Sequence, residues 1–111
     1  MIKHIVLWKL KESAGGQSKQ ENALQLKKEL EALNGVIPGM RLLEVGINMQ
    51  DSQSGDDADV ILYSEFEDMQ SLENYYPHPE HVKIKPFAQS IRSERRVIDY
   101  EVSDTQVEMH A

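Results

Sequence analysis

The segment Ile2–Leu10 has apolar side chains at both odd and even positions, and this constrains the fold more than any other stretch. In an extended strand, His4, Val6 and Trp8 point to one side, and the apolar residues between them point to the other. A strand of this kind is covered on both of its faces. Helices of the same chain can cover one face, so the second face needs another cover.

A helix is predicted to begin at Ser18 and to end near Asn34 and Gly35. Ser18 and Glu21 have the spacing of a capping box, in which each side chain binds a backbone amide of the other residue. Glycine after asparagine is a common helix stop. The apolar residues recur at intervals of three and four and form one stripe: Ala23, Leu26, Leu30 and Leu33. This pattern predicts a surface helix that lies on a sheet.

Residues 41 to 66 have the pattern of a strand, a polar loop and another strand. The first strand, Arg41–Met49, is expected to direct alternate apolar residues to one face: Leu43, Val45, Ile47 and Met49. The loop QDSQSGDDAD lacks the ligand spacing and the final glutamate of a calcium-binding loop, so it is interpreted as a solvated hairpin loop. The next strand covers Val60–Phe66.

Two helical segments and a last strand complete the chain. Asp68 is expected to cap a helix that stops at Pro77, and a second segment begins at Pro79. Pro86 bends or restarts this segment, because proline has no backbone amide to donate. Its inward face is predicted to consist of Ile84, Phe87, Ala88 and Ile91. A strand from 95 to 102 follows, and residues 103–111 form a tail that is expected to fray.

The order of elements, β-α-β-β-α-β, predicts an α+β ferredoxin-like fold with a four-stranded antiparallel sheet and both helices on one face. We expect a single domain over residues 1–102, followed by the C-terminal tail. Nothing in one chain remains to cover the second face of the sheet, although it is apolar. A homodimer formed through this sheet face is the simplest solution.

Composition excludes several classes of partner and chemistry. The 19 acidic and 12 basic residues give a formal net charge of −7, which argues against binding to nucleic acid or to an anionic membrane surface. There are no cysteines, and therefore no disulfides or thiolate ligands. The apolar run Ile5–Trp8 is too short to span a bilayer or to act as a secretory signal, so a cytoplasmic location is expected.

Three segments resemble the stress-responsive A/B barrel (Dabb) domain family over residues 1–102. They are the opening MIKHIVLWKLK, the turn centred on Pro38, and NYYPHPEHVK at residues 74–83. The most specific of these is the His-Pro-x-His motif preceded by tyrosine. The resemblance implies a homodimer in which two sheets face each other, a dimeric α/β barrel that encloses a small cavity per subunit.

The resemblance also implies candidate catalytic residues. Some family members are plant polyketide cyclases, in which a tyrosine, the second histidine of the motif and a histidine on the first strand are credited with acid-base roles. By position these residues are Tyr75, His81 and His4. The cyclases add a tyrosine from the first helix, whereas the first helix of this chain has no aromatic residue.

These residue types suit proton abstraction next to a carbonyl group. With His78 at the helix cap and Pro79 at the first helical position, both His78 and His81 lie at the positive end of a helix, which favours neutral imidazole. Neutral His81 can act as the base, and Tyr75 can donate to the carbonyl oxygen. His4 can orient the substrate. Further candidate ligand contacts are Val6, Trp8, Tyr76 and His78.

Other interpretations of the same residues remain open. A metal site that uses His78 and His81 with Glu80 or His4 is not predicted, because Pro79 and the capping conformation misdirect the first ring. No organic cofactor is predicted either. The alternative to a small-molecule binder is a non-catalytic stress-responsive or structural oligomer, in which His78 only caps a helix and the aromatic residues only pack. A cavity of roughly 300 Å³ or more beside the three candidate residues favours the binder.

Overall fold

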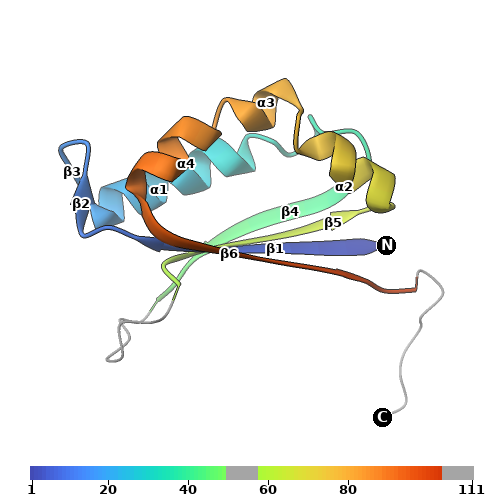
Figure 1. The fold of residues 1–111 in the computed structure, drawn as a ribbon, viewed down its shortest axis with the longest axis horizontal. Helices are drawn as coiled ribbons and strands as arrows, with labels where there is room; N and C mark the ends of the chain where they lie inside the picture. The colour runs from blue at the N-terminus through green and yellow to red at the C-terminus, as the bar shows by residue number, and fades with distance from the viewer. Residues whose placement is uncertain (50–57, 104–111) are drawn as a thin grey trace, which may run out of the picture.

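The computed structural model describes residues 1–49 and 58–103, and in them one sheet is covered on one face by helices (Figure 1). The elements in chain order are β1 (Ile2–Leu10), β2 (Ser13–Ala14), β3 (Gln17–Ser18), α1 (Lys19–Glu31), β4 (Met40–Ile47), β5 (Val60–Phe66), α2 (Met69–Tyr75), α3 (Pro79–Val82), α4 (Lys85–Ile91) and β6 (Arg92–Glu101). Apart from the small β2-β3 hairpin, which was not predicted, this is the expected ferredoxin-like order.

The main sheet has the strand order β4-β5-β1-β6, and all its neighbouring strands are antiparallel. Its register places Trp8 opposite Arg95 and His4 opposite Asp99. Strand β6 begins at Arg92, three residues earlier than predicted, because the pairing with β1 extends to Leu10.

The predicted strand Arg41–Met49 was too long at its C-terminal end. Strand β4 ends at Ile47, and Met49 is 96% exposed beyond it, so the placement of Met49 on the buried face was wrong. Leu43 and Val45 are buried as predicted. Most of the predicted hairpin loop, residues 50–57, lies outside the described residues.

Helix α1 begins with the predicted capping box. The Glu21 amide donates to Ser18 Oγ over 3.2 Å, and the Ser18 amide donates to Glu21 Oε1 over 3.0 Å. All four residues of the predicted apolar stripe are buried: Ala23, Leu26, Leu30 and Leu33. The helix ends at Glu31, three residues before the predicted stop, and turns lead to Gly35 with φ at +78°.

In the segment from residue 68 to 91, the prolines lie at or near the ends of the helices as predicted. The Ser71 amide donates to Asp68 Oδ1 over 2.8 Å at the start of α2, and that helix ends two residues before Pro77. His78 caps α3 by accepting from the Glu80 amide at Nδ1, over 3.1 Å. A new helix, α4, begins at Lys85 with a proline in its first turn. None of the helices among the described residues is long and apolar enough to cross a membrane.

The second face of the sheet carries no helix in the part of the chain that the structure describes (Figure 1). Three apolar side chains that point to this face are 39%, 48% and 44% exposed: Leu42, Ile98 and Tyr100. Single exposed apolar residues are ordinary, but a cluster on one flat face is typical of an interaction surface. The bare apolar face predicted from β1 is therefore present.

Candidate active site

A cavity of about 290 Å³ lies between the helices and the helix-facing side of the sheet. Six of the predicted site residues line it: His4, Val6, Trp8, Tyr75, Tyr76 and His81. His78 does not line it, and its ring instead accepts the capping hydrogen bond of α3. The resemblance implied a small cavity per subunit of a homodimer, and this cavity is formed by residues of one chain. The volume is just below the range for small-molecule pockets, which begins at roughly 300 Å³.

The backbone around the α2-α3 turn fixes the tautomer of His81. Its Nδ1 lies 3.0 Å from the carbonyl oxygen of Tyr76. A carbonyl oxygen only accepts hydrogen bonds, so Nδ1 carries the proton and the neutral ring has its free lone pair on Nε2. Burial lowers the pKa of His81, and the positive charges of Lys85 and Arg95 lower it further. The lowered pKa favours the neutral ring at pH 7, as predicted, and burial is its largest cause.

Tyr75 lies directly against His81. The centroids of the two rings are 4.3 Å apart, and Tyr75 is 2% exposed. Its hydroxyl has no hydrogen-bond partner among residues 1–49 and 58–103. Burial raises the pKa of Tyr75, so the hydroxyl keeps its proton at neutral pH and remains available as a donor.

His4 is held by a carboxylate on the neighbouring strand that sequence reasoning missed. His4 is 1% exposed, and its Nδ1 donates to Asp99 Oδ1 over 2.5 Å. Burial lowers the pKa of His4 and outweighs the opposite effect of Asp99, so the pair is a hydrogen bond of a neutral ring. Asp99 lies opposite His4 in the β1-β6 pairing, a register that the sequence did not reveal.

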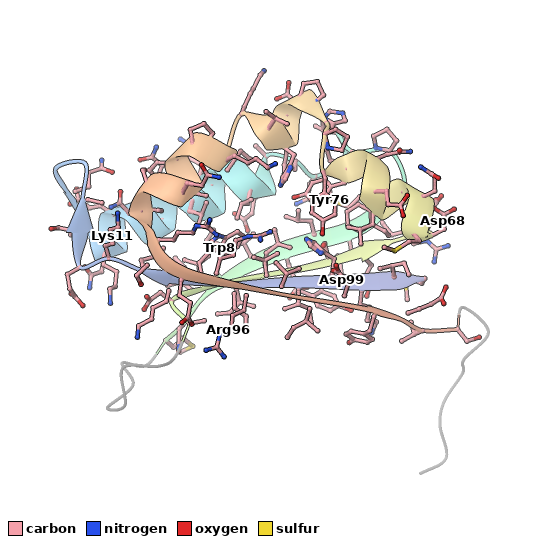
Figure 2. The ribbon with its side chains drawn as sticks, viewed as in Figure 1. Trp8, Lys11, Asp68, Tyr76, Arg96 and Asp99 are labelled. Atoms are coloured by element: carbon pink, nitrogen blue, oxygen red, sulfur yellow. The ribbon has the colours of Figure 1, made fainter. Side chains whose placement is uncertain are left out.

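Aromatic rings surround His4. The ring centroids of three residues lie 5.8–6.2 Å from that of His4 in edge-on arrangements: Phe66, Tyr75 and Tyr76. Figure 2 shows Tyr76 extending from the helix layer toward the sheet, with Asp99 below it. Burial raises the pKa of Tyr76, and the Asp99 carboxylate adds to this effect. Both tyrosine hydroxyls are therefore protonated near His4.

Part of the polar lining of the cavity was also missed. Four residues from α4 and β6 contribute to its lining: Lys85, Gln89, Arg92 and Arg95. Lys85 and Gln89 are on α4, Arg92 and Arg95 are on β6, and no single local motif marked the four as one group. Across the described ranges, no group of three or more histidines, aspartates and glutamates is arranged to hold a metal ion.

Together these features define a ferredoxin-like α+β protein with a cavity between its sheet and its helices that histidine, tyrosine and arginine side chains line. The chain belongs to the stress responsive A/B barrel domain family, whose sequence profile matches residues 2–102. The resemblance seen in the sequence is thereby confirmed.

Solved structures of other proteins share this fold. A dimeric protein of unknown function from Bacteroides fragilis is 35% identical, with 91% of this chain and 95% of that chain covered and a TM-score of 0.78. A dimeric ferredoxin-like protein from Thermobifida fusca is 16% identical, covers 91% of this chain and 90% of its own, and has a TM-score of 0.77. The hydroxynitrile lyase from Passiflora edulis is 19% identical over 96% of both chains, with a TM-score of 0.69. No curated protein matches the sequence significantly.

Proposed function

We propose that the cavity binds a small carbonyl compound, and that His81 and Tyr75 catalyse proton transfer at the carbon next to its carbonyl group. The observation that carries this proposal is the hydrogen bond from His81 Nδ1 to the Tyr76 carbonyl. It leaves Nε2 as the basic nitrogen of a neutral ring that lines the cavity. A base of this kind contributes roughly 10²–10⁴-fold to the rate of proton transfer.

The chemical step needs a donor beside the base, and Tyr75 fits this role. Nε2 of His81 takes the proton as the C–H bond breaks, and the electron pair moves to the carbonyl oxygen. The hydroxyl of Tyr75 donates to that oxygen while it gains negative charge. The resulting enolate is reprotonated at another carbon or attacks a second carbonyl, which gives isomerisation or aldol-type closure.

His4 is assigned a positioning role. Asp99 fixes its Nδ1 as the protonated nitrogen, so Nε2 of His4 is an acceptor for a hydroxyl or enol of the ligand. The hydroxynitrile lyase from Passiflora edulis is an enzyme of the same fold, so the fold is compatible with catalysis. Fold similarity alone does not define a reaction, and the proposal therefore depends on the residues of this cavity.

Hydrogen-deuterium exchange tests the proposal without knowledge of the natural substrate. Small neutral ketones such as phenylacetone are incubated with the protein in D₂O, and NMR follows deuterium uptake at the carbon next to the carbonyl. We expect the wild-type protein to accelerate uptake, His81→Ala to lower the rate about a hundredfold or more, and Tyr75→Phe to lower it by a smaller factor.

Tyr63→Phe is the matched control. Tyr63 lies on the opposite face of the sheet and donates to Glu65 over 2.6 Å, so its loss should not change the exchange rate. Circular dichroism checks that each variant is folded. Exchange that is equal in wild type and His81→Ala, across a panel of ketones, would leave the non-catalytic oligomer as the better description.

A further inference from the structure

We propose that the natural ligand carries a carboxylate, bound by Arg95 together with the indole N–H of Trp8. This inference rests on the proposed function, because it names the substrate class of the same cavity.

Three cations converge on this cavity: Lys85, Arg92 and Arg95. None of them has an ion pair with an acidic side chain among residues 1–49 and 58–103. The chain has an excess of seven acidic groups, so acids are abundant elsewhere. Unpaired cations gathered at one cavity in an acidic protein point to an anionic ligand.

Trp8 supplies the independent observation. It is 5% exposed and lines the cavity, and its Nε1 is the buried side-chain donor that lacks a hydrogen-bond partner in the described part of the chain. A buried donor without an acceptor destabilises a protein. Figure 2 shows Trp8 between the sheet and the helix layer. An oxygen atom of a bound carboxylate can supply the missing acceptor.

The sheet register brings Trp8 and Arg95 together. They are opposite each other in the β1-β6 pairing, and both contribute to the cavity lining. The acidic groups on the same face of β6 are Asp99 and Glu101. They are four and six residues from Arg95, which is about 13 Å and 20 Å along an extended strand. The Asp99 carboxylate also already accepts a hydrogen bond from His4. Arg95 and Trp8 are therefore free to bind two oxygens of one ligand.

A carboxylate fits this arrangement better than a larger anion. Guanidinium and carboxylate groups are both planar and form paired hydrogen bonds. The cavity volume of about 290 Å³ and the apolar wall of Val6, Leu62 and Ile84 suit a small organic acid with an apolar group. The charge of Arg95 also lowers the pKa of His81, so the carboxylate site and the base are electrostatically coupled.

The experiment uses Trp8 as its own reporter, because it is the single tryptophan of the chain. Its fluorescence is followed while the full-length protein is titrated with two acid-amide pairs, phenylacetate with phenylacetamide and butyrate with butyramide. Each pair has nearly the same shape and differs in charge. We expect at least one acid to bind about tenfold or more tightly than its amide, since charged hydrogen bonds are stronger than neutral ones.

Arg95→Gln and Arg96→Gln form a matched pair of variants. Both remove one positive charge from β6, but Arg96 lies on the opposite face, where its Nε donates to Glu94 (Figure 2). Arg95→Gln should remove the preference for the acid, whereas Arg96→Gln should keep it. Trp8→Phe lacks the fluorescent reporter, so calorimetric titration measures its affinity for the acid and for the amide. We expect this variant to bind the acid more weakly than the wild-type protein.

Equal affinity for acid and amide, no fluorescence response to either acid, or equal losses in the two arginine variants would overturn the carboxylate site. The deuterium exchange of neutral ketones is measured separately and depends on His81. If exchange persists without a preference for acids, only the carboxylate site is lost. If the preference persists without exchange, only the catalytic proposal is lost.

Discussion

His4 and Asp99 are joined across the β1-β6 pair by a hydrogen bond of 2.5 Å between Nδ1 and Oδ1. A carboxylate accepts and does not donate, so this bond fixes the neutral tautomer of a histidine that is almost completely buried. Tyr76 and Tyr75 lie against the same ring. The bond therefore sets the hydrogen-bonding pattern at the centre of the cavity.

Asp99→Leu and Asp99→Asn are expected to differ in stability. Asparagine retains a carbonyl oxygen that accepts from His4 Nδ1, whereas leucine leaves this buried donor without a partner. We expect Asp99→Leu to lower the free energy of unfolding by about 1–3 kcal/mol relative to Asp99→Asn. Urea unfolding followed by circular dichroism measures the difference. Equal stability of the two variants would show that water replaces the carboxylate.

Trp8→Phe is expected to weaken ligand binding but to change the stability of the fold only slightly. Phenylalanine keeps the aromatic surface in the cavity but removes the buried Nε1 donor. The loss of packing and the relief of the unsatisfied donor oppose each other, so the net change in unfolding free energy should be under about 1.5 kcal/mol. Thermal or urea unfolding without ligand measures it. A loss of several kcal/mol would mean that the indole serves mainly as packing.

The order of strands and helices was predictable because it depends on local signals. The capping box at Ser18, the prolines at 77, 79 and 86, and the alternation in β1 each act within a few residues. By contrast, the contacts within the candidate site could not be predicted, because they depend on pairing between strands that are distant in the sequence. Asp99 meets His4, and Arg95 meets Trp8, only through the register of β1 with β6, which no local pattern specifies.

The face of the sheet that holds the cavity could not be predicted for a related reason. Both faces of β1 are apolar, and alternation alone does not distinguish the face under the helices from the face left bare. The structure places His4 and Trp8 under the helices. Met49 was misplaced because β4 leaves the sheet at Ile47, although the alternation of apolar residues continues.

The exchange reaction should have a broad pH range. In the proposed reaction, neutral His81 is the base, and its pKa lies below the ordinary value of 6.5. The rate is thus expected to fall only when the pH drops through this lowered pKa. Tyr75 has a pKa raised above 10, so it should keep its proton up to that pH. Deuterium uptake measured between roughly pH 5 and 10 tests the profile. A rate that still rises steeply above pH 7 would argue against His81.

Arg95→Gln should move the acidic limb of this profile to higher pH. The positive charge of Arg95 is one of the causes that lower the pKa of His81, and its removal makes protonation easier. The matched control is Arg96→Gln on the other face of β6. An acidic limb that moves equally in both variants would indicate a general effect of net charge.

The bare sheet face is expected to hold the dimer. Ile98 is 48% exposed there, beside Ile5 of the paired strand, and Ile98→Asp would place a charge within the contact. We expect this change to weaken dimerisation at least about tenfold, because an unpaired buried charge costs several kcal/mol. Leu24→Asp, at a 61% exposed position on α1, is the control. Sedimentation velocity over a range of concentrations measures both, and dissociation of only the Leu24 variant would place the interface on the helices.

Gly39 allows Ser71 of α2 to pack closely against the turn after α1, and Tyr75 is at the end of the same helix. Its φ is +79°, and an added Cβ would come closer than 3.0 Å to Ser71 of α2. Gly35 has nearly the same φ, +78°, but open space around it.

Gly35→Ala should therefore cost only the backbone strain of about 1–2 kcal/mol. Gly39→Ala should cost more and should also slow deuterium exchange, because α2 must shift and displace Tyr75 from His81. Urea unfolding and the exchange assay on both variants measure these effects. If the two alanine variants lose equal stability and keep the wild-type exchange rate, the contact with Ser71 relaxes without moving the helix, and the position of Tyr75 does not depend on this turn.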